Sequence, residues 1–414
     1  MGVIARLLGV RNRWPRLLNR AVDYVADHPT GVLGRLAALR YRLPADVENV
    51  GVSVAGERAI RVLIAPVNYS SQGRMWAAAL ERADPDISAR NMAVDVPGGF
   101  AFPANLVVPV PVYQVSRSWQ ERQLSALSSF THVLIEAEEP LLGRYFGRSV
   151  AREVEVVRAF GADVAFMCHG TDIRLPSRHA ELTPWSPYRD PTLYSTRLES
   201  LALAHRALID RSGLPTFVST PDLLADVPQA IWCPVVVDLG AWATTDLSRR
   251  RPGPLRVVHA PTSSLMKGTS LIEPVLRRLE AQGAIEYSPI RGVPSAQMPA
   301  VFAQADVVLD QFRLGSYGVA ACEAMAAGRV VVGHIPRDVR ETVQRATGAS
   351  LPIVEATPDS LESVLLGLID GAQRLAERGH AGMTFVKNVH DGRMSSRLLL
   401  DNWLRPSGNH SETR

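Results

Sequence analysis

A glycine-bearing loop that leads into a predicted helix is the stretch of this chain best suited to chemistry. It reads Gly315-Ser-Tyr-Gly-Val-Ala-Ala-Cys-Glu-Ala-Met-Ala-Ala-Gly328 and follows a strand predicted at 305–310. The first N–H groups of a helix have no intrahelical acceptor, so such a loop can bind an anion. Glu323 lies about 1.4 turns into the helix, where its carboxylate can bind hydroxyl groups. A site for phosphate and hydroxyl groups describes a nucleotide sugar; the alternative is an ordinary βα turn with one buried, paired glutamate.

A second motif strengthens the first interpretation. Val257-Val-His-Ala-Pro261 and Met266-Lys-Gly-Thr269 lie about fifty residues upstream. Together the two motifs resemble the donor-binding signature of the retaining glycosyltransferases called family four, which have the GT-B fold. The resemblance covers most of residues 255 to 405 and is weaker in the N-terminal half. It implies metal-independent transfer of a sugar from a nucleotide-diphosphate donor, with retained anomeric configuration.

The resemblance assigns roles to residues of the C-terminal half. Lys267 matches the lysine that binds the donor diphosphate, and an ammonium there can offset charge that grows as the nucleotide leaves. Glu323 matches the glutamate that binds the ribose hydroxyls. The donor-binding set that the resemblance implies is completed by Gly268, Asp310, Gly315, Ser316, Tyr317, Gly318 and Val319. For Asp310, which ends a predicted strand, a strand-end cap is an equally good interpretation.

Two positions depart from the family pattern. The family often has an arginine shortly before the lysine, and residues 261–266 contain none, so Arg313 is the alternative source of positive charge. The first acid of the family's paired glutamates falls at Gly315. We expect backbone N–H groups of residues 316–319 to bind the sugar and phosphate there instead. These departures leave the donor sugar undetermined.

A histidine follows a predicted strand at 163–166 in the N-terminal half. The segment Met167-Cys-His-Gly-Thr-Asp172 resembles the family's histidine loop, so His169 is expected to contact the donor sugar or position the acceptor. Asp172 and Arg174 are candidates for contact with the acceptor. Gly73, at the start of the first predicted helix, would let a substrate approach the backbone closely. The alternative for a lone histidine is a purely structural role.

The remaining motifs argue against other chemistries. A net charge of +4 from 45 basic and 41 acidic residues is too balanced to indicate nucleic-acid binding. Three isolated cysteines favour a reducing compartment, without a disulfide framework or a zinc pattern. Asp84-Pro-Asp86 matches a short metal-binding pattern but lies among turn formers, so we expect no metal. Motifs for nucleotide-triphosphate hydrolysis, zinc proteolysis, esterase chemistry and ordinary dinucleotide binding are absent from the sequence.

The chain is long enough for two domains, since 414 residues exceed a usual single core. Apolar strands alternate with helical patterns in both halves, which predicts an α/β fold with two doubly wound, Rossmann-like domains. The resemblance implies a cleft between them and a C-terminal helix that crosses back to the first domain. The expected segments are a basic helical segment (1–50), an acceptor domain (51–225), a linker (226–254), a nucleotide-sugar domain (255–388) and a crossover helix with tail (389–414).

The N-terminal segment is basic and has apolar residues at helical spacing. Its apolar residues are Trp14, Leu17, Leu18, Ala21, Val22 and Val25, and the arginines before the first acid are Arg6, Arg11, Arg13, Arg16 and Arg20. Such stripes usually face a core, so the first expectation is packing against the chain's own domain. The alternative is a peripheral helix on an anionic membrane. With no apolar stretch that suits a signal peptide or a membrane span, we expect a cytoplasmic protein, with peripheral contact to the inner face of the membrane as this alternative.

The sequence therefore predicts a glycosyltransferase whose acceptor is a glycan, a lipid-linked saccharide or a metabolite. Its partners would be a nucleotide sugar and a carbohydrate-type acceptor; no nucleic-acid partner, metal or other cofactor is expected, and the oligomeric state is undetermined. Two other classes stay open because of the departures near Lys267 and at Gly315. One is a non-catalytic GT-B protein that binds sugar or nucleotide as an assembly partner. The other is a GT-B nucleotide-sugar epimerase.

Overall fold

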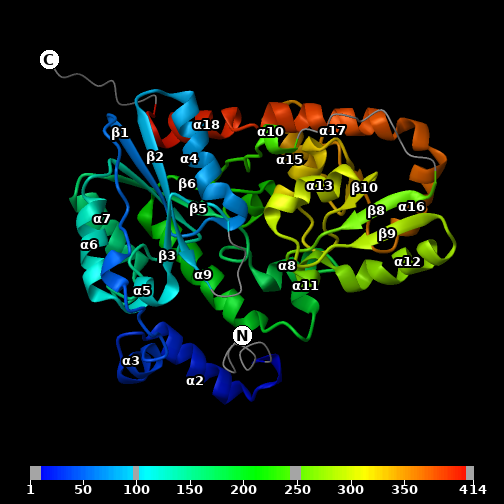
Figure 1. The fold of residues 1–414 in the computed structure, drawn as a ribbon. Helices are drawn as coiled ribbons and strands as arrows, with labels where there is room; N and C mark the ends of the chain where they lie inside the picture. The colour runs from blue at the N-terminus through cyan, green and yellow to red at the C-terminus, as the bar shows by residue number, and fades with distance from the viewer. Residues whose placement is uncertain (1–10, 97–101, 243–252, 407–414) are drawn as a thin grey trace.

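The computed structural model of the protein describes residues 11–96, 102–242 and 253–406. It contains two lobes, each built on a twisted sheet with helices on both faces (Figure 1). The first sheet has seven strands in the order β3-β2-β1-β4-β5-β6-β7, and the second has five in the order β12-β11-β10-β8-β9. Neighbouring strands of both sheets pair in parallel. The expected α/β architecture with two Rossmann-like domains is confirmed.

The elements follow the chain in regular alternation. The first sheet contains β1 (Ile60–Ala65), β2 (Ile87–Asp95), β3 (Leu106–Pro109), β4 (His132–Glu136), β5 (Asp163–Cys168), β6 (Thr216–Val218) and β7 (Ile231–Trp232). The second contains β8 (Leu255–His259), β9 (Ile285–Pro289), β10 (Val307–Leu309), β11 (Val330–Gly333) and β12 (Val354–Glu355). The helices before β8 are α2 (Arg16–Asp27), α3 (Val32–Ala38), α4 (Gln72–Ala83), α5 (Val110–Val115), α6 (Arg117–Leu127), α7 (Val150–Ala159), α8 (Pro176–Leu182), α9 (Ser195–Ser212) and α10 (Leu239–Trp242). Those after it are α11 (Ser264–Lys267), α12 (Thr269–Ala281), α13 (Met298–Ala303), α14 (Val319–Ala326), α15 (Arg337–Thr347), α16 (Leu361–Asp370), α17 (Leu375–Val389) and α18 (Arg393–Leu399).

The central strands form because their side chains are buried on both faces of the sheet. All five residues of β4 are buried, as expected for a continuous apolar run in a parallel sheet. β2 differs, because it carries Asn91 in its buried centre. The Asn91 amide donates to the carbonyls of Ile64 and Val67, at 3.0 and 3.2 Å, which offsets the cost of burying it. Because Asn91 and other polar residues interrupt its sequence, β2 was not predicted from apolar runs.

The chain crosses between the lobes twice, and the two crossings lie side by side. The N–H of Val237, on the outgoing segment, donates to the carbonyl of His390 on the returning one, at 2.8 Å. The return runs along one side of both lobes as α17 and α18 (Figure 1). At its end Trp403 and Leu404 pack with Trp76 in the core of the first lobe, so the predicted crossover helix is confirmed. The segment expected as a linker, 226–254, includes β7, and its residues 243–252 lie outside the described residues.

The N-terminal helices project from the first lobe, and their orientation corrects the favoured expectation (Figure 1). The face of α2 toward the lobe is polar: Asn19 is buried, and Asp23 accepts a hydrogen bond from the hydroxyl of Tyr194 at 2.9 Å. The predicted apolar stripe is divided: Leu17 and Leu18 are 78% and 48% exposed and Ala21 is exposed, whereas Trp14, Val22 and Val25 are half-buried. The expected packing of the stripe on the protein's own domain is therefore wrong for its exposed half. Among the described residues, no helix is both long and apolar enough to cross a membrane.

Candidate functional site

The strand order reverses at one place in each sheet, and ligands of doubly wound proteins bind beside such reversals. In the second lobe the reversal lies between β8 and β10, and in the first between β1 and β4. The segments after these strands carry most of the predicted site residues. Contacts from Leu314 and Ser316 to His179 and Asp222 hold the two carboxyl edges against each other.

Lys267 lies at the reversal in the second lobe. Its Nζ is 2.5 Å from Oδ1 of Asp310, so two predicted donor residues are brought together. Lys267 ends the one-turn helix α11. Gly268 separates α11 from α12 with φ +82°, a conformation that favours glycine. A side chain there would also meet Arg313 Cγ at 3.1 Å.

The loop 315–318 presents unbonded backbone donors. Gly315, Ser316 and Tyr317 are buried, yet no described residue accepts a hydrogen bond from the N–H groups of residues 315–318. Val319 and its successors add the free N–H groups of the first turn of α14. Buried backbone N–H groups are nearly always paired, so such a cluster indicates an anionic ligand.

Gly315, the position where the resemblance would place a first glutamate, has little room for a side chain. Its φ is +67°, and a Cβ would lie 2.9 Å from Cγ of Pro336. A glutamate would therefore require both the loop and Pro336 to move. Arg313, the expected source of extra positive charge, forms an ion pair with Asp190 at 3.2 Å.

Tyr317 corrects one assignment, because its side chain points into the core rather than toward a ligand. It is 2% exposed, and its hydroxyl lies 3.3 Å from Nε2 of His390. Only the backbone of Tyr317 can contribute to the loop's anion site. Asp310 is similarly buried, and its Oδ2 has no hydrogen-bond partner among the described residues.

Glu323 lines a small cavity between the lobes. The cavity measures about 110 Å³ and is also lined by Ala260, Pro261 and Thr262 after β8 and by Ile290 after β9. No described residue forms a hydrogen bond with the Glu323 carboxylate. Burial raises the pKa of Glu323 to about 8, although the nearby Lys267 ammonium opposes the rise. A buried carboxyl group without a partner can bind ribose hydroxyls.

Replacing Glu323 by Gln should change how stability depends on pH. Between the ordinary pKa of 4.5 and about 8, the unfolded chain ionises before the folded protein does. The wild type therefore loses stability as pH rises through this interval, and the loss stops above about 8. Gln cannot ionise. We therefore expect the melting temperature of the variant minus that of the wild type to increase by a few degrees as pH rises from about 5 to 8.5, measured by calorimetry. A constant difference across that range would contradict the raised pKa.

His169 lies at the carboxyl end of β5, as predicted. Its Nε2 is 3.2 Å from Oε1 of Glu136, which ends β4 and is fully buried. Burial raises the pKa of Glu136, and the bond to His169 opposes this rise. The carboxylate of Asp172 accepts the N–H groups of His169 and Gly170, which fixes the loop. Asp172 therefore positions His169 through the backbone.

The other predicted acceptor-side residues have mainly positioning roles. A Cβ on Gly73 would lie 2.8 Å from Oε2 of Glu136 and 2.4 Å from Nδ2 of Asn91, so the glycine makes room for these side chains. Arg174 bonds Asp222 at 2.5 Å, and Asp222 accepts the hydroxyl of Ser316 from the other lobe. Arg174 thus connects the first lobe to the predicted donor loop.

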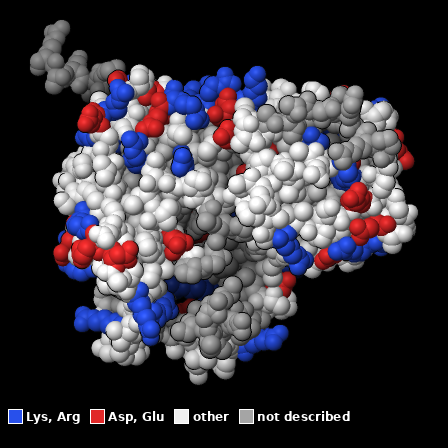
Figure 2. Space-filling view, in the orientation of Figure 1, with Lys and Arg blue, Asp and Glu red and all other residues white. Residues whose placement is uncertain are grey.

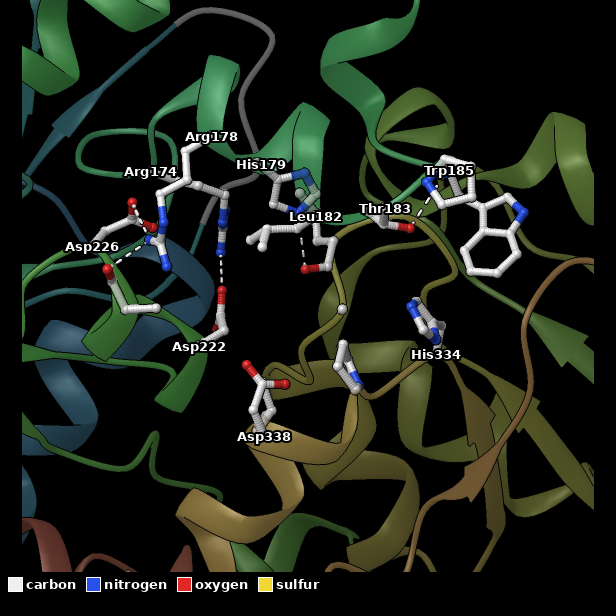
Figure 3. Close-up of a pocket in the computed structure, with 16 residues that line it drawn as sticks. Arg174, Arg178, His179, Leu182, Thr183, Trp185, Asp222, Asp226, His334 and Asp338 are labelled. Carbon is white, nitrogen blue, oxygen red and sulfur yellow. Dashed lines mark hydrogen bonds and ion pairs between the residues drawn. The ribbon is translucent and has the colours of Figure 1, made fainter.

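A cavity of about 290 Å³ lies beside this connection (Figure 3). Asp222 faces Arg174 across an ion pair, and Trp185 lies above His334 on the opposite side (Figure 3). The ring centroids of Trp185 and His334 are 5.2 Å apart. Gly315 also lines this cavity, together with Arg174 and Asp222 of the first lobe. One side of the loop 315–318 therefore faces the first lobe.

A larger cavity of about 720 Å³ was missed by the sequence analysis. It lies beside the carboxyl ends of β1, β2 and β3, and its polar lining residues are Asn68, Tyr69, Asp95, Gln114, Glu139 and Arg148. It shares Ser70, Phe102 and Thr262 with the cavity at Glu323, so the two are adjacent. The Tyr69 ring also meets the His169 ring, with centroids 5.2 Å apart. The acids after β4 were the sequence signal that could have located this cavity.

The two carboxylates of the Asp84-Pro-Asp86 motif form ion pairs in the structure. Both carboxylates pair with Arg405, at 3.0 Å for Asp84 and 3.5 Å for Asp86. The contact ties the end of the crossover segment to the first lobe.

The fold and its two facing carboxyl edges define a GT-B protein. No protein-family model matches the sequence, and no curated protein matches it. Anabaena HepE, solved with UDP-glucose, has a TM-score of 0.50 and 12% identity over 81% of this chain and 97% of its own. Sucrose-phosphate synthase from Thermosynechococcus elongatus has the same score and identity over 82% and 96%. A putative UDP-N-acetylglucosamine 2-epimerase from Listeria monocytogenes reaches only 0.43, with 12% identity over 82% and 94%. At these identities the likeness establishes the fold alone.

Proposed function

We propose that the protein is a glycosyltransferase that moves a sugar from a nucleoside-diphosphate donor to a carbohydrate-type acceptor, with retention of configuration. The observation that carries this proposal is the set of N–H groups at 315–318 that bond no described residue, in the segment that leads to Glu323. Amides, an ammonium and an unpaired carboxyl group match a diphosphate and a ribose. The adjacent cavity of about 720 Å³ is within the usual range for a small-ligand site.

Each part of the site has a role in this reaction. The N–H groups and Lys267 bind the diphosphate and offset its growing charge as the bond from the anomeric carbon to phosphate oxygen breaks. Glu323 binds the ribose. The larger cavity binds the acceptor, whose hydroxyl oxygen forms the new bond while its proton leaves with the diphosphate or to solvent. Glu136 and Asp172 orient His169 beside the reacting sugar.

Lys267 must exchange partners for this to happen. In the structure its ammonium is bound to Asp310 at 2.5 Å. A diphosphate carries more negative charge than one carboxylate, so it can draw the ammonium toward the N–H groups of the loop. Asp310 then keeps the lysine chain extended toward the site and limits its affinity for weaker anions.

A panel of nucleotide sugars tests the proposal, starting with UDP-glucose because the fold neighbour HepE was solved with it. We expect one donor to raise the melting temperature and to release nucleoside diphosphate in the presence of saccharide acceptors. Stabilisation by nucleotide without turnover would instead indicate a binding protein. Conversion of the sugar without release of nucleotide would indicate an epimerase.

We also propose that the N-terminal helices place the enzyme on an anionic membrane surface. Apolar side chains on α2 and α3 are exposed, with Leu17 at 78%, Val32 at 76% and the adjoining Leu39 at 74%. Basic side chains gather at the end of the molecule where α2 and α3 project (Figure 2). Arg16, Arg20, Arg35, Arg40 and Arg42 are exposed among the apolar residues. An apolar surface with surrounding arginines matches anionic lipid headgroups.

Replacing Arg16 and Arg20 by Glu should weaken vesicle binding. Each basic residue near a membrane contributes about 1 kcal/mol, so the pair should cost at least about tenfold in affinity. Co-sedimentation with phosphatidylglycerol–phosphatidylcholine vesicles measures this. The matched control is Arg337→Glu, since Arg337 is 92% exposed on the other lobe. Equal sedimentation of both variants, or binding of the wild type to neutral vesicles alone, would contradict the assignment.

A further inference from the structure

A cluster of a thiol and two carboxylates lies beside the His169 loop, and the proposed transfer uses only one of its members, Asp172, through the N–H groups of the loop. Glu138 follows β4, Cys168 ends β5, and Asp172 lies in the loop after it. The potential ligand atoms of these residues all lie within 4.8 Å of one another. Oε1 of Glu138 is 3.2 Å from Sγ of Cys168. Cys168 and Asp172 lie in the segment 167–172, whereas Glu138 lies thirty residues before Cys168, so the sequence does not show that the three residues meet.

One carboxylate oxygen in this cluster has no partner. Glu138 is 2% exposed, and its Oε2 makes no hydrogen bond to any described residue. The nearest ionisable nitrogen is Nδ1 of His205, at 3.7 Å, and that atom is already 3.0 Å from the carbonyl of Asp172. Leaving a buried carboxylate oxygen unbonded is costly. A ligand that binds oxygen would remove that cost.

The acidic groups of the cluster lie close together, and no described lysine or arginine is paired with them. In the part of the chain that the structure describes, neither Glu138 nor Asp172 forms an ion pair with lysine or arginine. Two acids and a thiol at this separation can therefore either hold protons or share a metal ion.

We propose that Glu138, Cys168 and Asp172 bind one divalent transition-metal ion, with zinc the best match. A thiolate is a soft ligand that favours zinc over magnesium or calcium, and carboxylates complete zinc sites at about 2.0–2.2 Å. Ligand atoms of a tetrahedral zinc site lie about 3.5 Å apart, so the separations in this cluster, all within 4.8 Å, must shorten where they exceed that value when an ion binds. His205 lies beside the cluster, with Nδ1 3.7 Å from Oε2 of Glu138. On binding, the Cys168 thiol gives its proton to solvent and its sulfur bonds the metal.

The ion would fix the histidine loop. Asp172 already accepts the N–H groups of His169 and Gly170. Anchoring its carboxylate on a metal would hold that loop against the ends of β4 and β5. The role is structural, and it stands independently of the proposed transfer reaction.

Cobalt provides a direct test on the full-length protein after treatment with a chelator. We expect one Co²⁺ per chain and an intense thiolate-to-cobalt absorption band, which Cys168→Ser abolishes. Cys233→Ser is the matched control. Cys233 is another buried free thiol, and its Sγ lies 3.9 Å from the carbonyl oxygen of Ser395, outside the cluster. Glu138→Gln, nearly identical in shape, should weaken Co²⁺ or Zn²⁺ binding more than about tenfold.

Three results would overturn the proposal. They are a wild type that binds no Co²⁺ with a thiolate band, a band that survives in Cys168→Ser, and equal metal affinity in Glu138→Gln. If Cys168→Ser does not fold, as judged by circular dichroism, the Glu138→Gln titration decides the question alone. The readout is metal binding, so failure here leaves the donor-site proposal standing.

Discussion

Lys267→Met abolishes most nucleotide binding and turnover. Among the described residues, Lys267 is the only lysine or arginine whose side chain interacts with both Asp310 and Glu323. Removing one preorganised donor to a developing oxyanion typically lowers kcat by about 10²–10³. We expect that loss, with at least about tenfold weaker binding of the nucleoside diphosphate by calorimetry. Lys387→Met, on the exposed surface of α17, is the matched control.

The variant also leaves Asp310 buried without its cation, which would destabilise the second lobe. A double variant, Lys267→Met with Asp310→Asn, separates the two effects. We expect it to regain the melting temperature of the wild type but not its nucleotide affinity. Asp310→Asn alone should bind nucleotide at least as well as the wild type, since it releases the ammonium. Wild-type affinity in Lys267→Met would remove this residue from the donor site.

His169→Ala should lower turnover far more than nucleotide affinity. His169 contacts the carboxylate of Glu136, and its ring packs against Tyr69, which lines the larger cavity. The residues proposed to bind the nucleotide lie on the other lobe. Loss of a positioning and hydrogen-bonding group at the reacting sugar costs about 10²–10³ in kcat. The dissociation constant of the nucleoside diphosphate should change by less than about twofold. Steady-state kinetics with calorimetry measure both.

Two further variants make this result specific. His380→Ala removes an exposed histidine on α17 and should leave turnover unchanged. Glu136→Gln keeps a polar group of the same shape beside His169 and should retain more activity than His169→Ala. If His169→Ala were as active as the wild type, His169 would have a purely structural role.

The second lobe was more accessible to sequence analysis than the first. The resemblance implied that Lys267, Asp310 and Glu323 belong to one donor site, and the segments that carry them follow β8 and β10, which are neighbours in the sheet. The direction of a loop side chain is not set by spacing, which is why Tyr317 was assigned to the donor site and instead contacts His390. The sequence indicated that N–H groups of residues 316–319 could bind the donor, and in the folded loop no described residue accepts a hydrogen bond from the N–H groups of 315–318.

The first lobe contains features that depend on distant partners. β2 carries Asn91 in its buried centre, and only the carbonyls of Ile64 and Val67 explain how that is tolerated. The orientation of α2 depends on Asp23 bonding Tyr194, far away along the chain. A helical period gives the spacing of an apolar stripe but not the direction in which the stripe faces. The larger cavity collects residues from several loops, so no single motif marks it.

The central claim is that the loop at 315–319, Lys267 and Glu323 form one diphosphate and ribose site. A crystal structure with the nucleoside diphosphate that stabilises the protein most would test it directly. The account predicts phosphate oxygens bonded to the N–H groups of this loop, Lys267 turned from Asp310 to the phosphate, and ribose hydroxyls on Glu323. A nucleotide bound elsewhere, with the Lys267–Asp310 pair intact and the loop's N–H groups still unbonded, would contradict it.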